Sequence, residues 1–341
     1  KNQFAVNLLR SQYAAKIAAL QAELAPDAPA VCYKIGSGAT CAMVDADVQA
    51  AFSASPATES PEEKSSLHMK FSVLMSVYRR EQPAFLHECL QSLHAQTQPA
   101  HEIVVVLDGE ITQNLQAALD EWRTRLPLKI VPLPQNVGLG KALNAGIEHC
   151  THDYIFRMDS DDIAHPERFA LQCAFVRQHP ETDLLGGQIA EFDRHIPEDG
   201  SRMNMRRVPL THTDIVRFSK KRNPFNHMTV AYRKSSLHRV GGYQHHLWME
   251  DYNLWLRMLA AGMQCANLPQ ILVYARTGRS MIGRRKGWQY IRSEWQLYRL
   301  KRRLALQTPP AAFVCFAQRA LPRLLPSALL QSLYNRLRRN P

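Results

Sequence analysis

The chain has 341 residues, of which 45% are hydrophobic and 21% charged, and its formal net charge is +12. This length holds one large domain or two smaller ones, and the composition is typical of a globular protein. No run of 18 apolar residues occurs, which argues against a membrane-spanning helix. The positive charge predicts an anionic partner.

The cysteines are scattered and odd in number, and no two of them form a C-x-x-C motif. They are Cys32, Cys41, Cys89, Cys150, Cys173, Cys265 and Cys315. This pattern argues against a disulfide scaffold or a zinc site and favours a reducing compartment, the cytoplasm. Only Cys32 and Cys41 are close enough in sequence to raise the question of a disulfide. No signal peptide is visible.

The first part of the chain differs in composition from the rest. Apolar residues recur at helical spacing over residues 1–25, which predicts an amphipathic helix. Residues 53–66, SASPATESPEEKSS, are typical of a linker. A strongly apolar segment follows at once from Met69, which we take as the original start. We therefore expect residues 1–52 to be a helical module or fusion partner, joined by a linker over 53–68.

From Met69 to about residue 183, apolar strands alternate with helices. FSVLMSVY, HEIVVVLDGE, LKIVPLP and DYIFRMD read as strands, and helices are expected over 83–96, 112–125 and GKALNAGIEHC. Continuous Val, Ile and Leu strands predict a mostly parallel sheet covered on both faces. Ligands of such sheets bind beyond the C-terminal ends of the strands, where Tyr78, Asp108 and Asp159 lie.

From residue 184 the alternation weakens, although the fold class remains α/β. LLGGQIAEF and MTVAYRK look like strands, and residues 248–260 look like a helix entered through two acids. We expect residues 69–183 and residues 184–283 to form two halves of one domain. Residues 284–341 contain thirteen Lys or Arg and one acid, Glu294, and predict a basic amphipathic helical tail.

Three aspartates within RMDSDD follow a buried strand, and they repel each other unless a cation lies between them. A helix cap explains only one of them, and Asp162 suits that role. An EF-hand loop is excluded because Ile163 follows Asp162 and the required Gly is missing. Carboxylates completed by substrate phosphates are the arrangement that Mg²⁺ prefers, and Mn²⁺ suits the same ligands. We predict such a site.

The glycines of NVGLGKALNAG match neither common phosphate-binding motif. One residue separates Gly138 from Gly140, and Ala142 follows Lys141, so the Walker spacing is absent. Leu143 stands where a dinucleotide fingerprint needs its third Gly. Lys141 and Asn144 near a helix start can still face a phosphate or a sugar.

Six motifs in order, across some 210 residues, resemble the family 2 glycosyltransferases of the GT-A fold. They are SVLMSVY, HECLQSLHAQT, VVVLDGE, NVGLGKALNAGI, RMDSDDIAHPER and WMEDYNLWLRM. The chain departs from the family pattern at Arg79, where Asn is usual, and at Leu107, where Asp is usual. The resemblance is nearest to bacterial enzymes that build surface polysaccharide or lipooligosaccharide.

The resemblance implies a nucleotide-sugar donor and inversion at the anomeric carbon, with residues 69–183 as the nucleotide-sugar half and residues 184–283 as the acceptor half. We expect the donor to be a UDP-sugar. Residues that it places around the donor are Ser76, Tyr78, Asp108, Asn136, Lys141, Asn144, Asp159 and Asp161. Asp108 would bind the base and Tyr78 would stack near it, while Asp161, and less directly Asp159, would bind Mn²⁺ or Mg²⁺. Asp251 would be the general base, and Glu250 would help to place the acceptor.

Two further side chains are candidates for acceptor contact, and each has an ordinary structural alternative. His227 follows Asn226 at a strand start, where a hydrogen-bonded loop residue is equally compatible with the pattern. Trp248 stands beside the two acids and would stack on a sugar ring, or be buried in the core. Arg276, Arg279, Arg284 and Arg285 are candidates to close over the diphosphate, or they form a solvated basic loop.

The basic tail mixes Arg and Lys with aromatic residues, which favours an anionic membrane surface. The alternative is a helical contact with a partner or with the core. No motif for nucleic acid reading is present, so no nucleic acid partner is expected. These features together predict a peripheral enzyme on the inner face of a bacterial inner membrane, acting on a glycan or lipid-linked acceptor. The alternatives are a nucleotide-sugar pyrophosphorylase, which needs a Gly-rich loop that SVYRREQP lacks, and a non-catalytic carbohydrate- or membrane-binding module.

Overall fold

The computed structural model describes residues 69–193, 195–197, 203–277 and 287–321, together with the backbone of 30–35 and 38–43. The chain divides into two compact units, Lys1–His68 and Met69–Pro341. In the first unit, β1 (Ala30–Ile35) and β2 (Gly38–Met43) form an antiparallel hairpin, in which Cys32 lies opposite Cys41. The sequence predicts a helical module or fusion partner over residues 1–52 and does not predict this hairpin. The predicted helix over 1–25 and the linker over 53–68 lie outside the described residues.

The second unit alternates strands and helices in chain order, as the sequence predicted. Its elements are β3 (Phe71–Val77), α4 (Pro83–His94), β4 (Glu102–Leu107), α5 (Gln113–Trp122), β5 (Leu128–Pro132), α6 (Leu139–His149), β6 (Tyr154–Arg157), β7 (Ile163–Ala164), α7 (Arg168–Gln178), β8 (Thr182–Phe192), β9 (Asn204–Arg206), α8 (His212–Ser219), η1 (His227–Thr229), β10 (Ala231–Arg233), α9 (Lys234–Arg239), α10 (Glu250–Ala260), β11 (Gln264–Arg276), α11 (Trp288–Arg303) and α12 (Pro309–Ala320).

The strands of the second unit form one sheet of nine strands, in the order β5-β4-β3-β6-β10-β8-β11-β7, with β9 paired to β8. β3, β4, β5 and β6 pair in parallel, and so do β8 and β11. β10 runs antiparallel to both of its neighbours, and β7 and β9 are also antiparallel. The predicted open, mostly parallel sheet is therefore confirmed, with three short antiparallel strands added.

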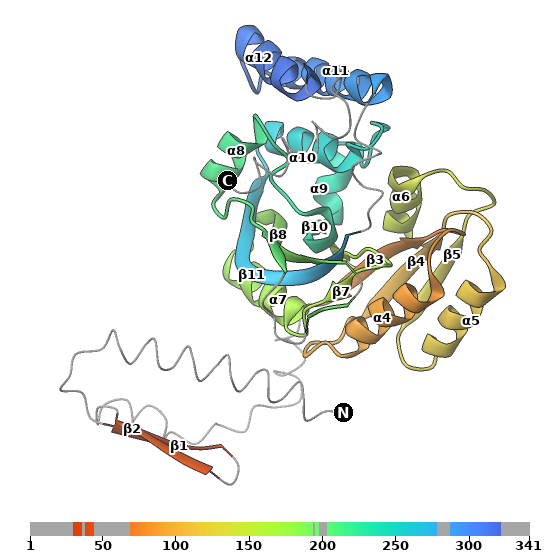
Figure 1. Ribbon diagram of the computed structural model, residues 1–341, viewed down its shortest axis with the longest axis vertical. Helices are drawn as coiled ribbons and strands as arrows, with labels where there is room; N and C mark the ends of the chain where they lie inside the picture. Colours follow the sequence, from red (N-terminus) through yellow and green to blue (C-terminus); the bar gives the residue numbers. More distant parts are fainter. Residues whose placement is uncertain are drawn as a thin grey trace. The chain divides into compact units, whose positions relative to one another are not determined.

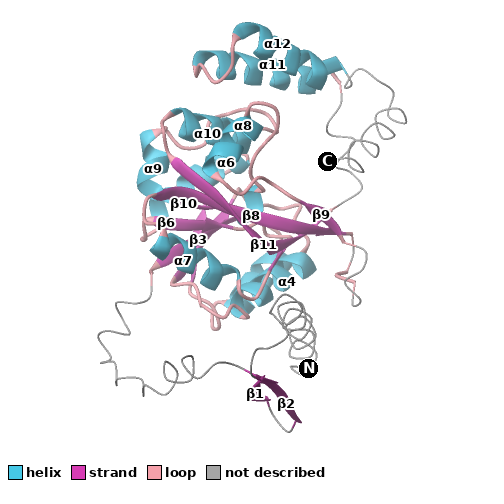
Figure 2. Cartoon of the chain, turned by 90° about the vertical axis from the view of Figure 1, so that its left-hand side faces the viewer, coloured by secondary structure: helices cyan, strands magenta, loops and turns pink. Residues whose placement is uncertain are grey.

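Helices cover both faces of the sheet (Figures 1 and 2). Alternate residues of β3 and β4 enter different cores because successive side chains of a strand point to opposite faces. One core contains apolar residues of α4, α5 and α7, and the other contains those of α6, α8, α9 and α10. Strands buried on both sides explain why the sequence showed continuous apolar runs.

α11 and α12 pack on each other, and α11 contacts α10. A third, smaller core lies between α10 and α11. It contains Met249, Tyr252, Leu256, Tyr290, Leu297 and Leu300. The tail is helical where it is described, and its residues beyond 321 lie outside the described part. Among the described helices, none has both the length and the apolar character that crossing a bilayer requires.

Candidate active site

The loop between β6 and β7 gathers the three aspartates of RMDSDD. One carboxylate oxygen from each of Asp159, Asp161 and Asp162 lies within 4.8 Å of the others. β6 lies in the middle of the sheet, between β3 and β10, so the loop emerges at the C-terminal ends of the parallel strands. This is the edge where the sequence predicted a ligand site.

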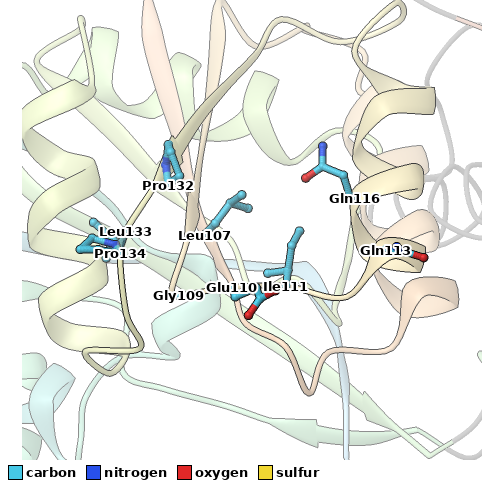
Figure 3. A pocket seen from close by; sticks show the side chains of 9 residues that line it. All are labelled: Leu107, Gly109, Glu110, Ile111, Gln113, Gln116, Pro132, Leu133 and Pro134. Carbon is cyan, nitrogen blue, oxygen red and sulfur yellow. The ribbon is translucent and has the colours of Figure 1, made fainter.

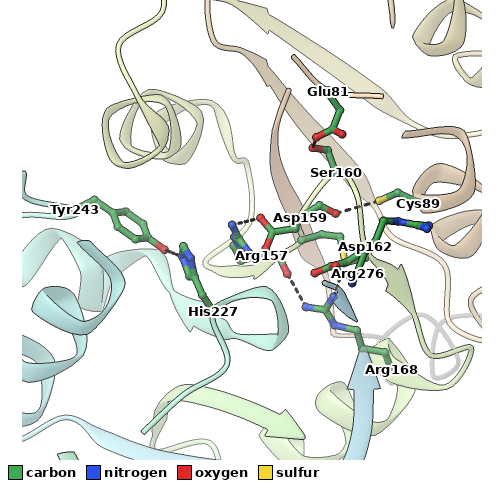
Figure 4. A network of polar contacts seen from close by, with 11 residues as sticks. Glu81, Cys89, Arg157, Asp159, Ser160, Asp162, Arg168, His227, Tyr243 and Arg276 are labelled. Atoms are coloured by element: carbon green, nitrogen blue, oxygen red, sulfur yellow. Dashed lines mark hydrogen bonds and ion pairs between the residues drawn. The ribbon is translucent and has the colours of Figure 1, made fainter. Parts of the chain in front are cut away.

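The acids of this cluster have different partners. Asp159 forms an ion pair with Arg157, which comes from the end of β6 (Figure 4). Asp162 is only 2% exposed and accepts a hydrogen bond from the backbone N–H of Arg276 at 2.8 Å. Its Oδ2 is buried and finds no hydrogen-bond partner within the described part of the chain. The suggested capping role of Asp162 is wrong, since α7 begins at Arg168 after Glu167.

Uncompensated negative charge accumulates in this loop. Burial raises the pKa of Asp161 to about 7, and the nearby carboxylates of Asp159 and Glu81 add to the shift. Burial also raises the pKa of Asp162, again with help from its acidic neighbours. A hard divalent cation binds oxygen ligands, gives a buried oxygen a partner and removes the repulsion between carboxylates. This loop has all three features. The residues present fit Mg²⁺ or Mn²⁺.

Asp108 organises the loop that leads into α6. Its Oδ1 accepts the N–H of Val137 at 2.6 Å, and its Oδ2 accepts the N–H of Gly138 at 3.1 Å. The side-chain amide of Asn136 donates to the same Oδ2 at 3.0 Å. A Cβ on Gly109, which has φ +81°, would lie 2.6 Å from the backbone N of Asn136, so the close approach requires glycine. Asp108 and Asn136, both predicted to bind the nucleotide-sugar, are thus hydrogen-bonded to each other.

The other predicted donor residues lie around the same edge of the sheet. Tyr78 directly follows β3 and is 42% exposed, while Ser76 is half-buried within that strand. Lys141 is exposed in the first turn of α6. The Asn144 side chain pairs with the backbone of Tyr243, donating to its C=O and accepting from its N–H at 2.8 Å each. Asn144 therefore fastens α6 to the segment before α10.

The predicted acceptor-side acids occupy the first turn of α10. Asp251 accepts a hydrogen bond from the side-chain amide of Asn223 at 2.6 Å. Burial raises the pKa of both Glu250 and Asp251, and hydrogen bonds and the charge of Arg157 moderate the shift at Asp251. A Cβ on Gly140 would lie 3.4 Å from Cγ of Glu250, so the donor-side helix α6 abuts this pair.

The structure places the two suggested acceptor contacts differently from an open sugar site. His227 Nε2 lies 2.8 Å from the hydroxyl of Tyr243, and burial lowers the pKa of this imidazole, with the charge of Arg157 adding to the shift. Trp248 stacks on Tyr290 of α11, with ring centroids 5.6 Å apart and an interplanar angle of 18°. Their roles toward an acceptor remain predictions.

Two arginines hold the acidic loop: sequence reasoning missed Arg157 and considered Arg276 only for another role. Arg157 is 1% exposed and forms an ion pair with Asp159, and its charge lowers the pKa of Asp251 and of His227. Arg276 donates from Nε to the backbone O of Asp161 at 3.0 Å and pairs with Glu88. Its guanidinium lies 3.9 Å from the ring centroid of Phe85, so it is packed inward and does not extend over a diphosphate. Arg279, Arg284 and Arg285 lie outside the described residues.

A shallow pocket of about 390 Å³ opens beside this site, at the ends of β4 and β5 (Figure 3). The lining residues are Leu107, Gly109, Glu110, Ile111, Gln113, Gln116, Pro132, Leu133 and Pro134. It contains no member of the aspartate cluster. Its lining is mostly apolar, and Leu107 and Gly109 of that lining are the two chain neighbours of Asp108.

Comparison with known proteins agrees with this geometry. The profile of the family described as Glycosyl transferase family 2 matches residues 72–241. An uncharacterised glycosyltransferase of Haemophilus influenzae is 52% identical over 78% of this chain and 98% of its own. The amylovoran biosynthesis glycosyltransferase AmsE of Erwinia amylovora is 48% identical, over 79% of this chain and 99% of its own.

More distant relatives share the same fold. A UDP-Gal:alpha-D-GlcNAc-diphosphoundecaprenol beta-1,3-galactosyltransferase of Escherichia coli is 38% identical over 67% of this chain and 84% of its own. The structure of Staphylococcus aureus TarS 1–349 with UDP-GlcNAc superposes with a TM-score of 0.53 at 22% identity, covering 75% of this chain and 72% of that one. A Pyrobaculum calidifontis mannosyltransferase with GDP-Man and Mn²⁺ gives 0.52 at 17% identity, covering 79% and 80%. The chain belongs to the family 2 glycosyltransferases and has their GT-A fold.

Proposed function

We propose that the protein is a metal-dependent, inverting glycosyltransferase that moves a sugar from a UDP-sugar to a lipid-linked or glycan acceptor during bacterial surface polysaccharide synthesis. The observation that carries this proposal is the aspartate cluster at the C-terminal edge of the parallel strands, with a second pair of acids at the start of α10. The aspartate cluster lies beyond β6, and Glu250 and Asp251 lie on α10 against the start of α6. The names of AmsE and the galactosyltransferase support the substrate class.

The donor is held on the side of the sheet formed by β3, β4 and α6. Tyr78 is exposed at the end of β3 and is available to stack on the base, with Ser76 behind it. Asp108 and Asn136 fix the loop before α6, and Lys141 presents its ammonium from the first turn of that helix. A helix N-terminus and a cation together favour a phosphate. The TarS complex with UDP-GlcNAc supports a UDP-sugar as the donor.

The metal would be held by Asp161, with Asp159 and Asp162 beside it. Mn²⁺ or Mg²⁺ at these carboxylates would neutralise the charge that grows on the diphosphate as the sugar leaves. Asp162 is anchored by the backbone of Arg276, and Asp159 is anchored by Arg157. In the described part of the chain no other side chain anchors the Asp161 carboxylate in this way, and its raised pKa reflects burial and repulsion that a cation would relieve.

Asp251 would act as the general base. The acceptor oxygen forms its bond to the anomeric carbon while the bond from that carbon to the diphosphate breaks, and the hydroxyl proton passes to Asp251. Attack from the face opposite the leaving group gives inversion. Burial makes this carboxylate a better proton acceptor than an exposed aspartate, and the Asn223 amide fixes its orientation. Glu250, against Gly140, is placed to orient the acceptor; His227 and Trp248 are further candidates.

The C-terminal helices would place the enzyme on the inner face of the bacterial inner membrane. Trp288 is 78% exposed, Phe313 53% and Leu321 63%, which is unusual for residues of this size. Exposed Arg299, Arg302 and Arg303 accompany them on α11. Apolar side chains flanked by cations are suited to anionic lipid, where a lipid-linked acceptor is found.

One assay tests the central proposal. The protein is incubated with a panel of nucleotide sugars, an undecaprenyl diphosphate-linked sugar acceptor and Mn²⁺ or Mg²⁺, and release of nucleoside diphosphate is measured. We expect release from a UDP-sugar, its loss with EDTA, and its loss in Asp161→Ala. Activity that persists in both EDTA and Asp161→Ala would rule out the metal role, and absence of transfer with every donor would rule out the proposed activity.

A further inference from the structure

α11 binds the short segment that leads into the two acids of α10. Ser293 Oγ donates to the backbone O of Leu247 at 2.6 Å, and the backbone O of Ser293 accepts from His246 Nε2 at 2.9 Å. Gln296 donates to the backbone O of His245 at 3.0 Å. The rings of Tyr290 and Trp248 stack. Four consecutive residues, 245–248, are therefore each held by α11.

This segment needs an external support because its own backbone does not favour the conformation that it adopts. Trp248 has φ 62°, in the left-handed region that a bulky residue rarely occupies. Met249 is the N-cap of α10 but its side chain makes no capping hydrogen bond. A capping side chain usually fixes the start of a helix, and here that element is missing. The contacts with α11 take its place.

A chain of hydrogen bonds runs from Ser293 of α11 through His246 to Asn253 and Arg257 of α10. A backbone carbonyl only accepts, so His246 carries its proton on Nε2 and its Nδ1 accepts from the Asn253 amide at 3.1 Å. The Asn253 Oδ1 in turn accepts from Nε of Arg257 at 2.8 Å. The imidazole of His246 is therefore neutral in this pattern of bonds, and its burial, which lowers its pKa, acts in the same direction.

α11 is itself firmly attached to the domain, so it can act as a support. Glu294 is 1% exposed and pairs with Arg319 of α12 at 2.7 Å. Lys301 is 2% exposed and donates to the backbone O of Lys220, after α8, at 2.7 Å. These charges would be costly to bury without a defined geometry. The helix that the sequence predicted as part of a basic amphipathic tail is thus bonded to the rest of the second unit.

We propose that α11 positions the general base: Ser293 and Tyr290 hold residues 245–249 so that Asp251 and Glu250 face the bound donor. This inference rests on the proposed function of Asp251. Ser293 and Tyr290 do not touch substrate; they act through the start of α10. Loss of either contact should lower the rate of transfer while leaving donor binding unchanged, because the donor is held by β3, β4, α6 and the β6–β7 loop.

The test compares Ser293→Ala and Tyr290→Leu with Gln289→Ala, a matched control at an exposed position of the same helix. We expect kcat to fall about tenfold in the first two, which corresponds to a small displacement of the base. The Kd for UDP with Mn²⁺ should stay within about twofold of wild type. Wild-type kcat in both variants, or an equal loss of UDP binding, would overturn the inference.

A double-variant cycle separates positioning from general loosening of the fold. If Ser293 acts through Asp251, adding Ser293→Ala to Asp251→Asn should not reduce the residual rate any further. An additional tenfold loss in that background would contradict the proposal. Amide hydrogen exchange gives a readout that does not depend on turnover. Ser293→Ala should lower protection in residues 246–254 and Gln289→Ala should not, and unchanged protection would also overturn the inference, whatever the activity.

Discussion

At the scale of single residues, the carboxylates around Asp161 lower the stability of the metal-free fold and suit the site to a cation. Three carboxylates lie within 4.8 Å, and only Arg157 forms an ion pair with one of them in the described structure. Metal-free protein therefore holds a carboxyl group that resists ionisation. The repulsion lowers the stability of the metal-free protein. A bound cation removes the repulsion, so metal binding restores that stability.

This reasoning predicts how metal binding depends on pH. The pKa of Asp161 is raised from 3.8 to about 7, so the folded state binds a proton that the unfolded state has lost above pH 4. The contribution of this carboxyl group to the stability of the metal-free fold is greatest at low pH and is lost as pH rises toward 7. Mn²⁺ needs the ionised carboxylate, so its affinity should fall by up to about tenfold per unit below pH 7.

Isothermal titration of Mn²⁺ at pH 8, 7 and 6 measures this dependence. The Asp161→Asn variant should bind Mn²⁺ weakly at every pH, and its metal-free melting temperature should match or exceed that of wild type at pH 8. If wild-type affinity is the same at pH 8 and 6, Asp161 does not titrate in this range or is not a ligand.

Asp251 gives a second prediction at this scale. Replacing it with Asn keeps the size of the side chain but removes the proton acceptor. Transfer should fall by about 10²–10⁴-fold, the usual contribution of a general base. The Kd for UDP with Mn²⁺ should not change, because donor contacts come from other elements. Asp120→Asn, at an exposed position of α5, is the matched control and should remain fully active. Transfer that survives in Asp251→Asn places the base elsewhere.

At the scale of elements, α6 is pressed closely against the sheet. A Cβ on Gly146 would lie 2.4 Å from Cδ1 of Leu74 and 2.6 Å from Cγ2 of Val106, both fully buried. On Gly140, six residues earlier in the same helix, the nearest atom would be at 3.4 Å. The approach at Gly146 lets α6 carry Asn144 and Lys141 to the edge of the sheet.

These two glycines form a matched pair for a stability measurement. Ala favours a helix over Gly by about 1 kcal/mol, so Gly140→Ala should leave the melting temperature unchanged or raise it. At Gly146 the overlap should outweigh that gain, since overpacking a core costs about 1–3 kcal/mol. We expect Gly146→Ala to lower the free energy of unfolding in a denaturant titration. An equal or higher value would show that Leu74 and Val106 move aside.

The sequence predicted the elements whose pattern is local. The strands of the first half and α4, α5, α6 and α10 fall where apolar periodicity placed them, within a few residues. β11 was not predicted, although at 13 residues it is the longest strand, because PQ interrupts its apolar pattern. The register shifts of its pairing with β8 lie near this interruption. The short strands β7 and β9 contain too few residues to show a period. The short strand β10 lies within the predicted strand MTVAYRK.

The candidate site was predictable only where a motif is contiguous. Asp159, Asp161, Glu250 and Asp251 were identified from two short motifs. Arg276 is a candidate for the diphosphate or for a solvated basic loop on sequence alone, because nothing in the sequence indicates that its guanidinium packs on Phe85 and Phe192. The pairing of Asn223 with Asp251 and the contacts of Ser293 join residues 28 and 46 or 47 positions apart, which a single sequence does not reveal.

At the scale of the whole molecule, positive charge and exposed aromatic rings are concentrated at the C-terminal helices. Trp295 and Phe316 pack edge to face at 5.3 Å and join α11 to α12, leaving Trp295 44% exposed. Arg299 and Arg302 follow Trp295 by four and seven residues, so they lie on the same face of α11. The face that α11 turns to solvent is thus amphipathic, while its opposite side supports α10.

This surface predicts salt-dependent binding to anionic vesicles. Each Arg near an anionic surface contributes about 1 kcal/mol, so Arg299→Gln with Arg302→Gln should weaken partitioning onto vesicles with 30% phosphatidylglycerol by roughly 30-fold. Phe313→Ser should weaken it further and also reduce binding to neutral vesicles, because it removes apolar contact. Arg123→Gln with Arg125→Gln, two exposed arginines at the end of α5, is the control for net charge. Equal losses from both pairs in a co-sedimentation assay would show that overall charge, and not the α11 face, attracts the membrane. A loss confined to the α11 pair, with donor binding intact, would place lipid recognition on the helix that also supports the base.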